Sequence, residues 1–295
     1  MNSRERGFLL LSSQLGDPAR HILTVAQLRH LALRVAAAEK PTEERELVPA
    51  DLLALGYSAE MAERIVALLG EEDRLDWYLQ RGRRAQCVPL TRVSESYPVI
   101  LRQRLRLDSP GVLWARGDLS ILEKPRIALV GSREIREENA AFAARVGAEA
   151  AIQGYVLVSG NARGADHIAQ AACLNAGGQV ISVVADELQK QKVQENVLYL
   201  SEDSFDMPFS SARALSRNRV IHALGEKTFV AQCTLAKGGT WSGTVRNLRE
   251  HWNGVFGLRD GSEAIRQLEQ LGAVLIDNED LSNLQGLPED NPKLF

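Results

Sequence analysis

The sequence predicts an α/β fold with a doubly wound, mostly parallel sheet, preceded by a small all-helical domain. From about residue 86, short apolar runs of strand length alternate with helical segments. Such alternation is typical of a parallel sheet covered by helices on both faces, as in extended Rossmann-like folds. Residues 1–85 instead carry apolar residues at helical spacing. The chain has 295 residues, 45% of them hydrophobic, which is enough for a substantial core.

The helical domain is expected over residues 1–85. Apolar residues from Leu23 to Val35 follow helical spacing and stop at the polar run 39–46. Two short helices then follow, and Ser58 is a plausible N-cap for the second. A third helix is predicted near residues 71–82.

The sheet domain is expected over residues 86–285, and residues 286–295 look like a C-terminal tail. Apolar runs that end in glycine or begin after it mark the first strands and helices. Strands are predicted at 126–131, 155–160 and 179–184, and helices at 138–154 and 164–178. Further strands and helices of the same kind continue to about residue 276.

Ligands of such sheets bind beyond the carboxyl ends of the strands, where helix N-termini favour anions. In this sequence, glycines, hydroxyls and arginines gather behind two predicted strands: Gly131, Ser132 and Arg133 after the first, and Ser159, Gly160, Arg163 and Gly164 after the second. The glycines would allow close backbone approach, and the arginines can bind phosphate through two hydrogen bonds. Asp166 is expected to cap the helix or to brace one of the arginines.

Two later clusters are further candidates for phosphate binding. The first is Arg217, Asn218 and Arg219, interpreted as a helix start, and the second is Lys237, Gly238, Gly239 and Thr240, interpreted as a turn after a strand. Trp241 could stack on a base, although packing in the core is its commoner role. The chain contains neither GxGxxG nor GxxxxGK[ST], so neither nucleotide fingerprint applies.

The composition and charge of the chain limit the classes of function that the protein can have. The net charge of −3 means that a nucleic-acid binder must gather its cations locally. The histidines lack ligand spacing, so we expect no metal and no cofactor. The three cysteines, Cys87, Cys173 and Cys233, are far apart and are expected to be buried, reduced thiols. No apolar run is long enough to span a bilayer, so we expect a soluble, cytoplasmic protein with no membrane partner.

In order along the chain, these motifs resemble the DNA-processing protein A family (DprA, also called Smf). The resemblance rests on the 131–133 motif, the 159–166 turn, the 217–219 motif and the segment from Tyr97 to Asp118. It implies a protein that binds and protects single-stranded DNA and passes it to a RecA-type recombinase, without catalysis, in DNA uptake, natural transformation or recombination. It also implies a homodimer, and a helical N-terminal domain similar in kind to the SAM-like module of many members.

Two departures from related families bear on catalysis. Gln170 stands where the DprA family usually has a histidine, and Asn247 stands where nucleotide hydrolases of the LOG group have a glutamate. We also expect the helix dipole to lower the pKa of Asp166, which would make it a poor proton donor. A nucleotide N-glycosidase or a nucleotide-binding sensor that uses the same pocket remains the alternative to a DNA-binding protein.

Overall fold

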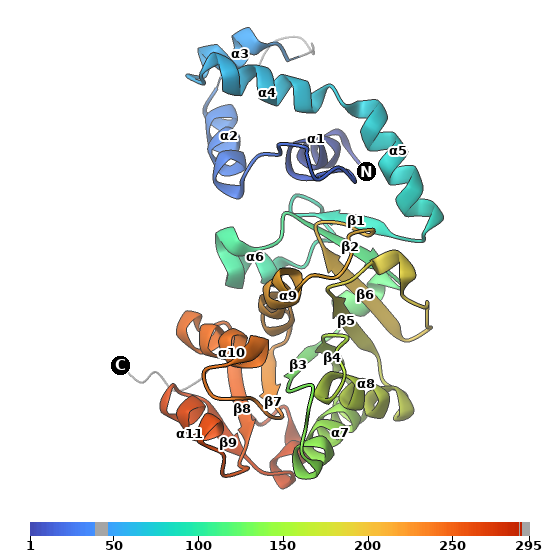
Figure 1. Ribbon diagram of the computed structural model, residues 1–295, viewed down its shortest axis with the longest axis vertical. Coiled ribbons are helices and arrows are strands. Elements are labelled where there is room, and N and C mark those ends of the chain that lie inside the picture. Colours follow the sequence, from blue (N-terminus) through green and yellow to red (C-terminus); the bar gives the residue numbers. More distant parts are fainter. Residues whose placement is uncertain (39–46, 289, 291–295) are drawn as a thin grey trace.

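The computed structural model of the chain describes residues 1–38, 47–288 and 290 (Figure 1). The polar run predicted at 39–46 lies outside the described residues, and so does most of the tail predicted at 286–295. The described part of the chain forms a helical domain followed by a sheet with helices on both faces. The predicted fold class is confirmed.

The N-terminal domain is helical, as predicted. Ser58 accepts a hydrogen bond from the backbone N–H of Met61, which confirms it as an N-cap. A small core of its own includes Leu23, Leu52 and Ile65. The helices are α1 (Ser3–Ser12), α2 (Val25–Ala37), α3 (Pro49–Ala54), α4 (Ala59–Leu69) and α5 (Glu72–Arg84).

A sheet of nine strands forms the rest of the described chain, in the order β1-β2-β6-β5-β4-β3-β7-β8-β9. β2 pairs antiparallel with both β1 and β6, and the other pairs are parallel. The sequence analysis placed no strand at β6, which polar segments flank. The strands are β1 (Val88–Thr91), β2 (Val112–Arg116), β3 (Arg126–Val130), β4 (Val156–Ser159), β5 (Val180–Val184), β6 (Val197–Glu202), β7 (Lys227–Val230), β8 (Gly254–Leu258) and β9 (Val274–Ile276).

Helices cover both faces of the sheet, so the doubly wound arrangement is confirmed. Ile127 and Leu129 of β3 belong to the core that α7 and α8 share, whereas Ala128 and Val130 belong to the core that α9 and α10 share. Figure 1 shows these helix pairs on opposite sides of the central strands. The helices of this domain are α6 (Val99–Leu105), α7 (Glu137–Ile152), α8 (Ala165–Asn175), α9 (Ser211–Leu224), α10 (Gly238–Glu250) and α11 (Glu263–Gln270).

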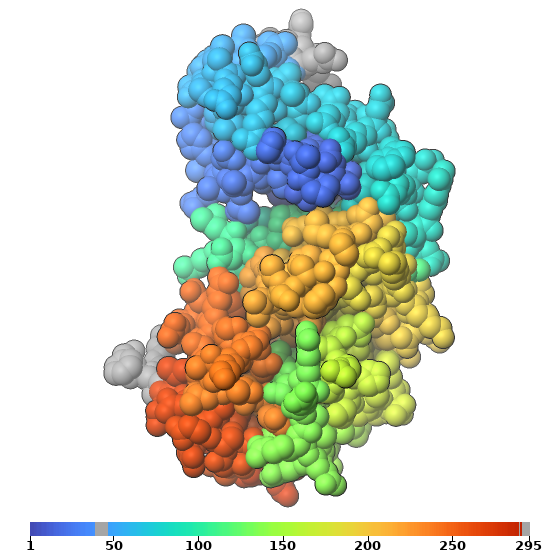
Figure 2. Space-filling view, in the orientation of Figure 1, coloured from blue at the N-terminus to red at the C-terminus, as the bar shows by residue number. Residues whose placement is uncertain are grey.

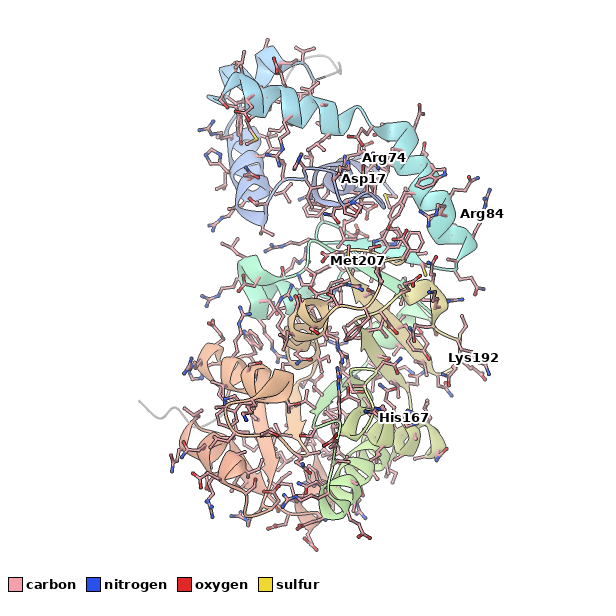
Figure 3. The ribbon with its side chains drawn as sticks, viewed as in Figure 1. Asp17, Arg74, Arg84, His167, Lys192 and Met207 are labelled. Atoms are coloured by element: carbon pink, nitrogen blue, oxygen red, sulfur yellow. The ribbon has the colours of Figure 1, made fainter. Side chains whose placement is uncertain are left out.

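The helical domain shares a core with the sheet. Tyr78 of α5 is fully buried, and its ring lies 5.5 Å from that of Trp114 and 4.8 Å from that of Phe205. Its hydroxyl is 2.8 Å from both Ser204 and Asp206, so the buried phenol is satisfied. Within the helical domain, an ion pair of 2.9 Å joins Asp17 to Arg74 of α5 (Figure 3).

The three cysteines are buried and unpaired, as the sequence predicts. Burial raises the pKa of Cys87 and of Cys173 to about 11, and that of Cys233 to about 12. Among the described residues, no group of three His, Cys, Asp or Glu side chains is placed to bind a metal ion. In this described part of the chain, no helix is both long enough and apolar enough to cross a bilayer.

Candidate functional site

A cavity of about 1000 Å³ opens at the carboxyl ends of β3, β4 and β7. The strand order reverses between β3 and β7, and ligands of doubly wound sheets bind at such a switch point. The turns after the three strands, the face of α9 from Ser211 to Ile221 and the first turn of α10 line this cavity. We call it the switch-point cavity.

Two glycines bring the turn after β3 against the start of α8. Gly164 has φ +80°, and a Cβ on it would lie 2.4 Å from the carbonyl oxygen of Ser132. A Cβ on Gly131 would lie 2.3 Å from that of Ala165. Both positions therefore exclude side chains because the chain packs closely on itself. Gly131, Ser132 and Arg133 line the cavity.

Gly160 has a role that the sequence analysis did not foresee. A Cβ there would lie 1.8 Å from Nη1 of Arg217, so the glycine makes room for this guanidinium and not for a ligand. Arg217 is buried, donates to the carbonyl oxygen of Val183 at 2.6 Å and lines the cavity. Burial lowers the pKa of Arg217; an arginine nevertheless stays charged.

Ser159 is fully buried and does not line the cavity. Its hydroxyl accepts a hydrogen bond of 2.7 Å from Nε2 of Gln170, which also bonds to the carbonyl oxygen of Gly160. Gln170, which replaces the family's histidine, thus anchors the end of β4. Ser159 and Gly160 shape the site from beneath.

Asp166 braces the turn after β4. Its carboxylate accepts a hydrogen bond of 3.3 Å from the N–H of Ala162 and lies 3.9 Å from Nη2 of Arg217. The prediction that the helix dipole lowers its pKa is wrong: burial raises the pKa of Asp166 to about 6. Loss of hydration outweighs the nearby positive charge here.

Four exposed cations line the cavity, and three of them are unpaired over the described part of the chain: Arg133, Arg163 and Lys237. Among the residues that the structure describes, none of these three side chains has a hydrogen-bond or ion-pair partner. Arg136 also lines the cavity and forms an ion pair with Asp260. Such unpaired guanidinium and ammonium groups are suited to bind phosphate.

The 217–219 motif lies in the middle of α9, not at a helix start as interpreted from the sequence. Arg217 and Asn218 line the switch-point cavity, but Arg219 does not. Arg219 forms an ion pair of 2.6 Å with Glu202 and donates to the carbonyl oxygen of Asp108 at 2.9 Å. The structure therefore brings two of these three residues to the site.

The 237–240 cluster is the first turn of α10, and all four residues line the cavity. Gly238 has φ +78°, and Gly239 packs so closely on Asn218 that a Cβ would lie 2.5 Å from Nδ2. Thr240 donates to the carbonyl oxygen of Gly131 at 3.0 Å. No side chain caps this helix, so its first N–H groups are available to an anion.

Sequence reasoning missed two apolar residues at this site. Phe209 and Leu215 line the cavity, and each is 54% exposed. Phe209 follows a proline just before α9, and no local pattern marked it as exposed. Trp241 instead packs against the core beneath α9 and α10 and does not line the cavity, so its packing interpretation is confirmed.

Asn247 lies away from the cavity. It is fully buried, and its Nδ2 donates to Oδ1 of Asn253 at 2.8 Å and lies 3.2 Å from Nδ1 of His222. Burial lowers the pKa of His222 to about 3, so this imidazole stays neutral. Asn247, which stands where hydrolases of the LOG group have a glutamate, also donates to Thr228 of β7. It therefore joins α10 to β7 and does not line the cavity.

The fold and the site define a Rossmann-like protein with a cavity at its switch point that five cationic side chains line. Residues 89–257 match the model of a family described as DNA recombination-mediator protein A, and this chain belongs to that family. The family resemblance drawn from the motifs is thereby confirmed.

Curated relatives support the same assignment. The chain is 32% identical over 150 residues to DNA processing protein DprA of Bacillus subtilis. This match covers 47% of the chain and 50% of the relative. It is 30% identical over 210 residues to protein Smf of Escherichia coli, and this match covers 65% of the chain and 55% of the relative. The chain thus spans about half the length of these relatives.

Solved structures share the fold. DNA processing protein A of Streptococcus pneumoniae superposes with a TM-score of 0.69 at 22% identity, covering 88% of this chain and 92% of that one. The Helicobacter pylori protein superposes with a TM-score of 0.56 at 24% identity, covering 68% of this chain and 95% of that one.

Proposed function

We propose that this protein binds single-stranded DNA in the switch-point cavity. The observation that carries the proposal is the charge of the lining: five cations, Arg133, Arg136, Arg163, Arg217 and Lys237, against two carboxylates, Glu134 and Asp166. A net charge of −3 over the whole chain makes such local concentration informative. Family membership supports a role in DNA processing.

Single strands suit this site better than duplex. Strand-end turns, one face of α9 and the first turn of α10 form the cavity, which presents backbone N–H groups and guanidiniums to phosphates. Exposed Phe209 and Leu215 offer apolar surface to unstacked bases. The Helicobacter pylori relative is described as binding single-stranded DNA.

The test compares labelled oligo-dT with a duplex of equal length by fluorescence anisotropy across a salt series. We expect tighter binding of the single strand and affinity that falls steeply with salt, because phosphate contacts release counterions. Equal affinity for the two forms, or affinity indifferent to salt, would contradict the proposal.

We further propose that the protein protects bound DNA and passes it to a RecA-type recombinase, as a cytoplasmic homodimer. The support is family membership. Recombinase ATPase activity on single-stranded DNA should rise when this protein is added, and mass photometry should find a dimer. The two measurements are independent, so the proposed transfer to a recombinase and the proposed homodimer can each fail without the other.

Hydrolysis of a nucleotide, or sensing of one, is the second candidate. Asp166 favours it, because a carboxyl with a pKa near 6 is a competent proton donor near neutrality. The burial of Asn247 weighs against an N-glycosidase of the LOG kind. We expect no release of base from AMP and no tight binding of free nucleotide. Base release that Asp166→Asn abolishes would establish the enzyme instead, and tight binding of a free nucleotide without turnover would establish the sensor.

A further inference from the structure

A second basic cavity lies between the helical domain and the sheet domain. Its volume is about 840 Å³, and residues of α2, α6 and α10 line it. Figure 2 shows the surface hollowed between the blue N-terminal helices and the green segment that carries α6. Over the described residues, only two carboxylates line it, those of Asp108 and Glu250. Six arginines line it: Arg29, Arg92, Arg102, Arg104, Arg106 and Arg246. We call it the arginine cleft.

Hydrogen bonds from guanidinium groups to backbone carbonyl oxygens hold three of these arginines beside one another. Arg92 donates to the carbonyl oxygen of Arg106 at 2.6 Å, and Arg102 donates to that of Arg92 at 3.1 Å. Burial lowers the pKa of Arg92, and repulsion from Arg102 and Arg29 lowers it further. Positive charge is therefore crowded here at a cost in free energy, which an anion would relieve.

Few acidic groups neutralise this charge. Arg246 forms an ion pair with Asp108 and lies over the ring of Trp252. Over the described residues, Arg29, Arg92, Arg102 and Arg106 have no ion-pair partner. Arg106 also has φ +49°, a conformation that favours glycine. Backbone strain at an exposed arginine that lines a cavity is itself an indication of function.

The arginine cleft is connected to the switch-point cavity. A third cavity, of about 820 Å³, shares Leu215 with the switch-point cavity. The same third cavity shares Val25, Asp108 and Arg246 with the arginine cleft. Three cavities with shared lining residues thus lead from the strand ends, over α9 and α10, to α2 of the helical domain.

We propose that the arginine cleft is a second binding surface for single-stranded DNA, where a strand that leaves the switch-point cavity continues across α9 and meets Arg29 and Arg106. This inference rests on the proposed function. The cleft alternates guanidiniums with apolar side chains such as Leu28 and Leu107, which suits phosphates and bases together. Its connection to the switch-point cavity favours DNA over an acidic segment of another protein.

The test is the double variant Arg29→Ala/Arg106→Gly, with Arg84→Ala as the matched control. Glycine at 106 adopts the positive φ without strain, which protects folding. Arg84 is exposed at the end of α5 and lines neither cavity (Figure 3). Affinity for oligo-dT is measured at graded lengths, from about 4 to about 30 nucleotides, across a salt series.

We expect unchanged affinity for the shortest oligonucleotides that bind and a loss of roughly tenfold for long ones. The salt slope on long DNA should become shallower by about 1.4, or about 0.7 for each lost contact. Long DNA that binds the double variant as tightly as the control would overturn the inference while leaving the proposed function intact.

Two other outcomes are decisive. If Arg133→Ala and Arg163→Ala leave the binding of long DNA unchanged while the double variant weakens it, the switch-point proposal fails, and with it the inference that one strand runs through both cavities. Labelled poly-glutamate serves as the probe for an acidic protein segment. If the double substitution abolishes poly-glutamate binding and leaves long DNA unaffected, the cleft is a protein-binding surface and the inference is wrong.

Discussion

Arg133 and Arg163 follow neighbouring strands and present unpaired guanidiniums to the switch-point cavity. We expect Arg133→Ala and Arg163→Ala each to weaken oligo-dT binding by about tenfold, because each removes a phosphate partner. The salt slope should become shallower by about 0.7 for each. Thermal unfolding should be unchanged, since both side chains are exposed. Arg249→Ala, in the last turn of α10 and outside the cavity, is the control. Wild-type binding and salt slope in either variant would show that its arginine is not a contact.

We expect the affinity for DNA to depend on pH through Asp166, which lines the switch-point cavity. Its pKa in the folded protein, about 6, lies above that of an exposed carboxyl, so it takes up a proton as the pH falls from about 7 to about 5. The cavity then loses a negative charge, and we expect tighter binding of oligo-dT at pH 5. Asp166→Asn should bind more tightly at pH 7 and lose most of this pH dependence. A variant that keeps the wild-type profile would assign the titration to another group.

The raised pKa of Asp166 also makes the stability of the fold depend on pH. The folded state holds the proton of Asp166 more tightly than the unfolded state does, so this carboxyl lowers stability as the pH rises from about 4 to about 6. At pH 7 the cost is about 3 kcal/mol. Urea unfolding at pH 5 and pH 7 should show a smaller difference for Asp166→Asn than for the wild type. An equal difference would contradict the assignment.

At the scale of residues, the sequence predicted the position of the strand-end arginines well and the environment of buried groups poorly. Arg133 and Arg163 follow recognisable strands, so their position depends only on local pattern. The pKa of Asp166 and the contact between Gly160 and Arg217 depend on which elements pack over the turn. Phe209 was missed because a single sequence does not indicate which apolar side chains are exposed.

The helix α9 explains why its basic motif divides between two places. Successive residues of an α-helix point about 100° apart, so three consecutive residues cannot all face one cavity. Arg217 and Asn218 face the switch-point cavity, and Arg219 reaches Glu202 of β6. The sequence located the motif but not its place within the helix. The N-cap, Ser210, stands among other serines that hide the true start.

The helices α7 and α8 meet at a glycine. A Cβ on Gly147 would lie 2.1 Å from the carbonyl oxygen of Ala169, so Gly147→Ala must push the two helices apart. We expect a loss of about 1–3 kcal/mol in the free energy of unfolding, measured in urea. Gly7→Ala is the control, because a Cβ there meets only Leu69 at 3.8 Å. It should be neutral or stabilise α1 by up to about 1 kcal/mol. Equal stability of the two variants would contradict this close packing.

Across the whole molecule, Tyr78 couples the helical domain to the sheet. Its ring packs on Trp114 and Phe205, and all three are fully buried. Tyr78→Ala should cost about 3–5 kcal/mol and should separate a single unfolding transition into two, followed by circular dichroism and tryptophan fluorescence. Trp77→Ala is the control, because Trp77, the residue next to Tyr78 in the sequence, is 53% exposed. A small effect of Tyr78→Ala would mean that the domains fold independently.

The general architecture was predictable because strand and helix alternation is a local pattern. The sequence indicated the parallel strands and their helices, and it indicated a helical segment before them. It did not reveal β6, which joins the antiparallel edge to the parallel strands. Nor did it reveal how the helical domain docks, because the contact between Tyr78 and Trp114 joins distant segments. The arginine cleft depends on that docking and was invisible for the same reason.

Because the three cysteines are buried, we expect the native chain to react only slowly with thiol reagents. With pKa values of about 11 or above, Cys87, Cys173 and Cys233 are almost entirely protonated at neutral pH, and only a thiolate attacks maleimides. A cysteine introduced on the surface, such as Arg84→Cys, would therefore take up a fluorophore selectively without removal of the native three. Each domain can thus carry a single dye, and the path of a bound DNA strand can be followed by energy transfer in the otherwise unaltered protein.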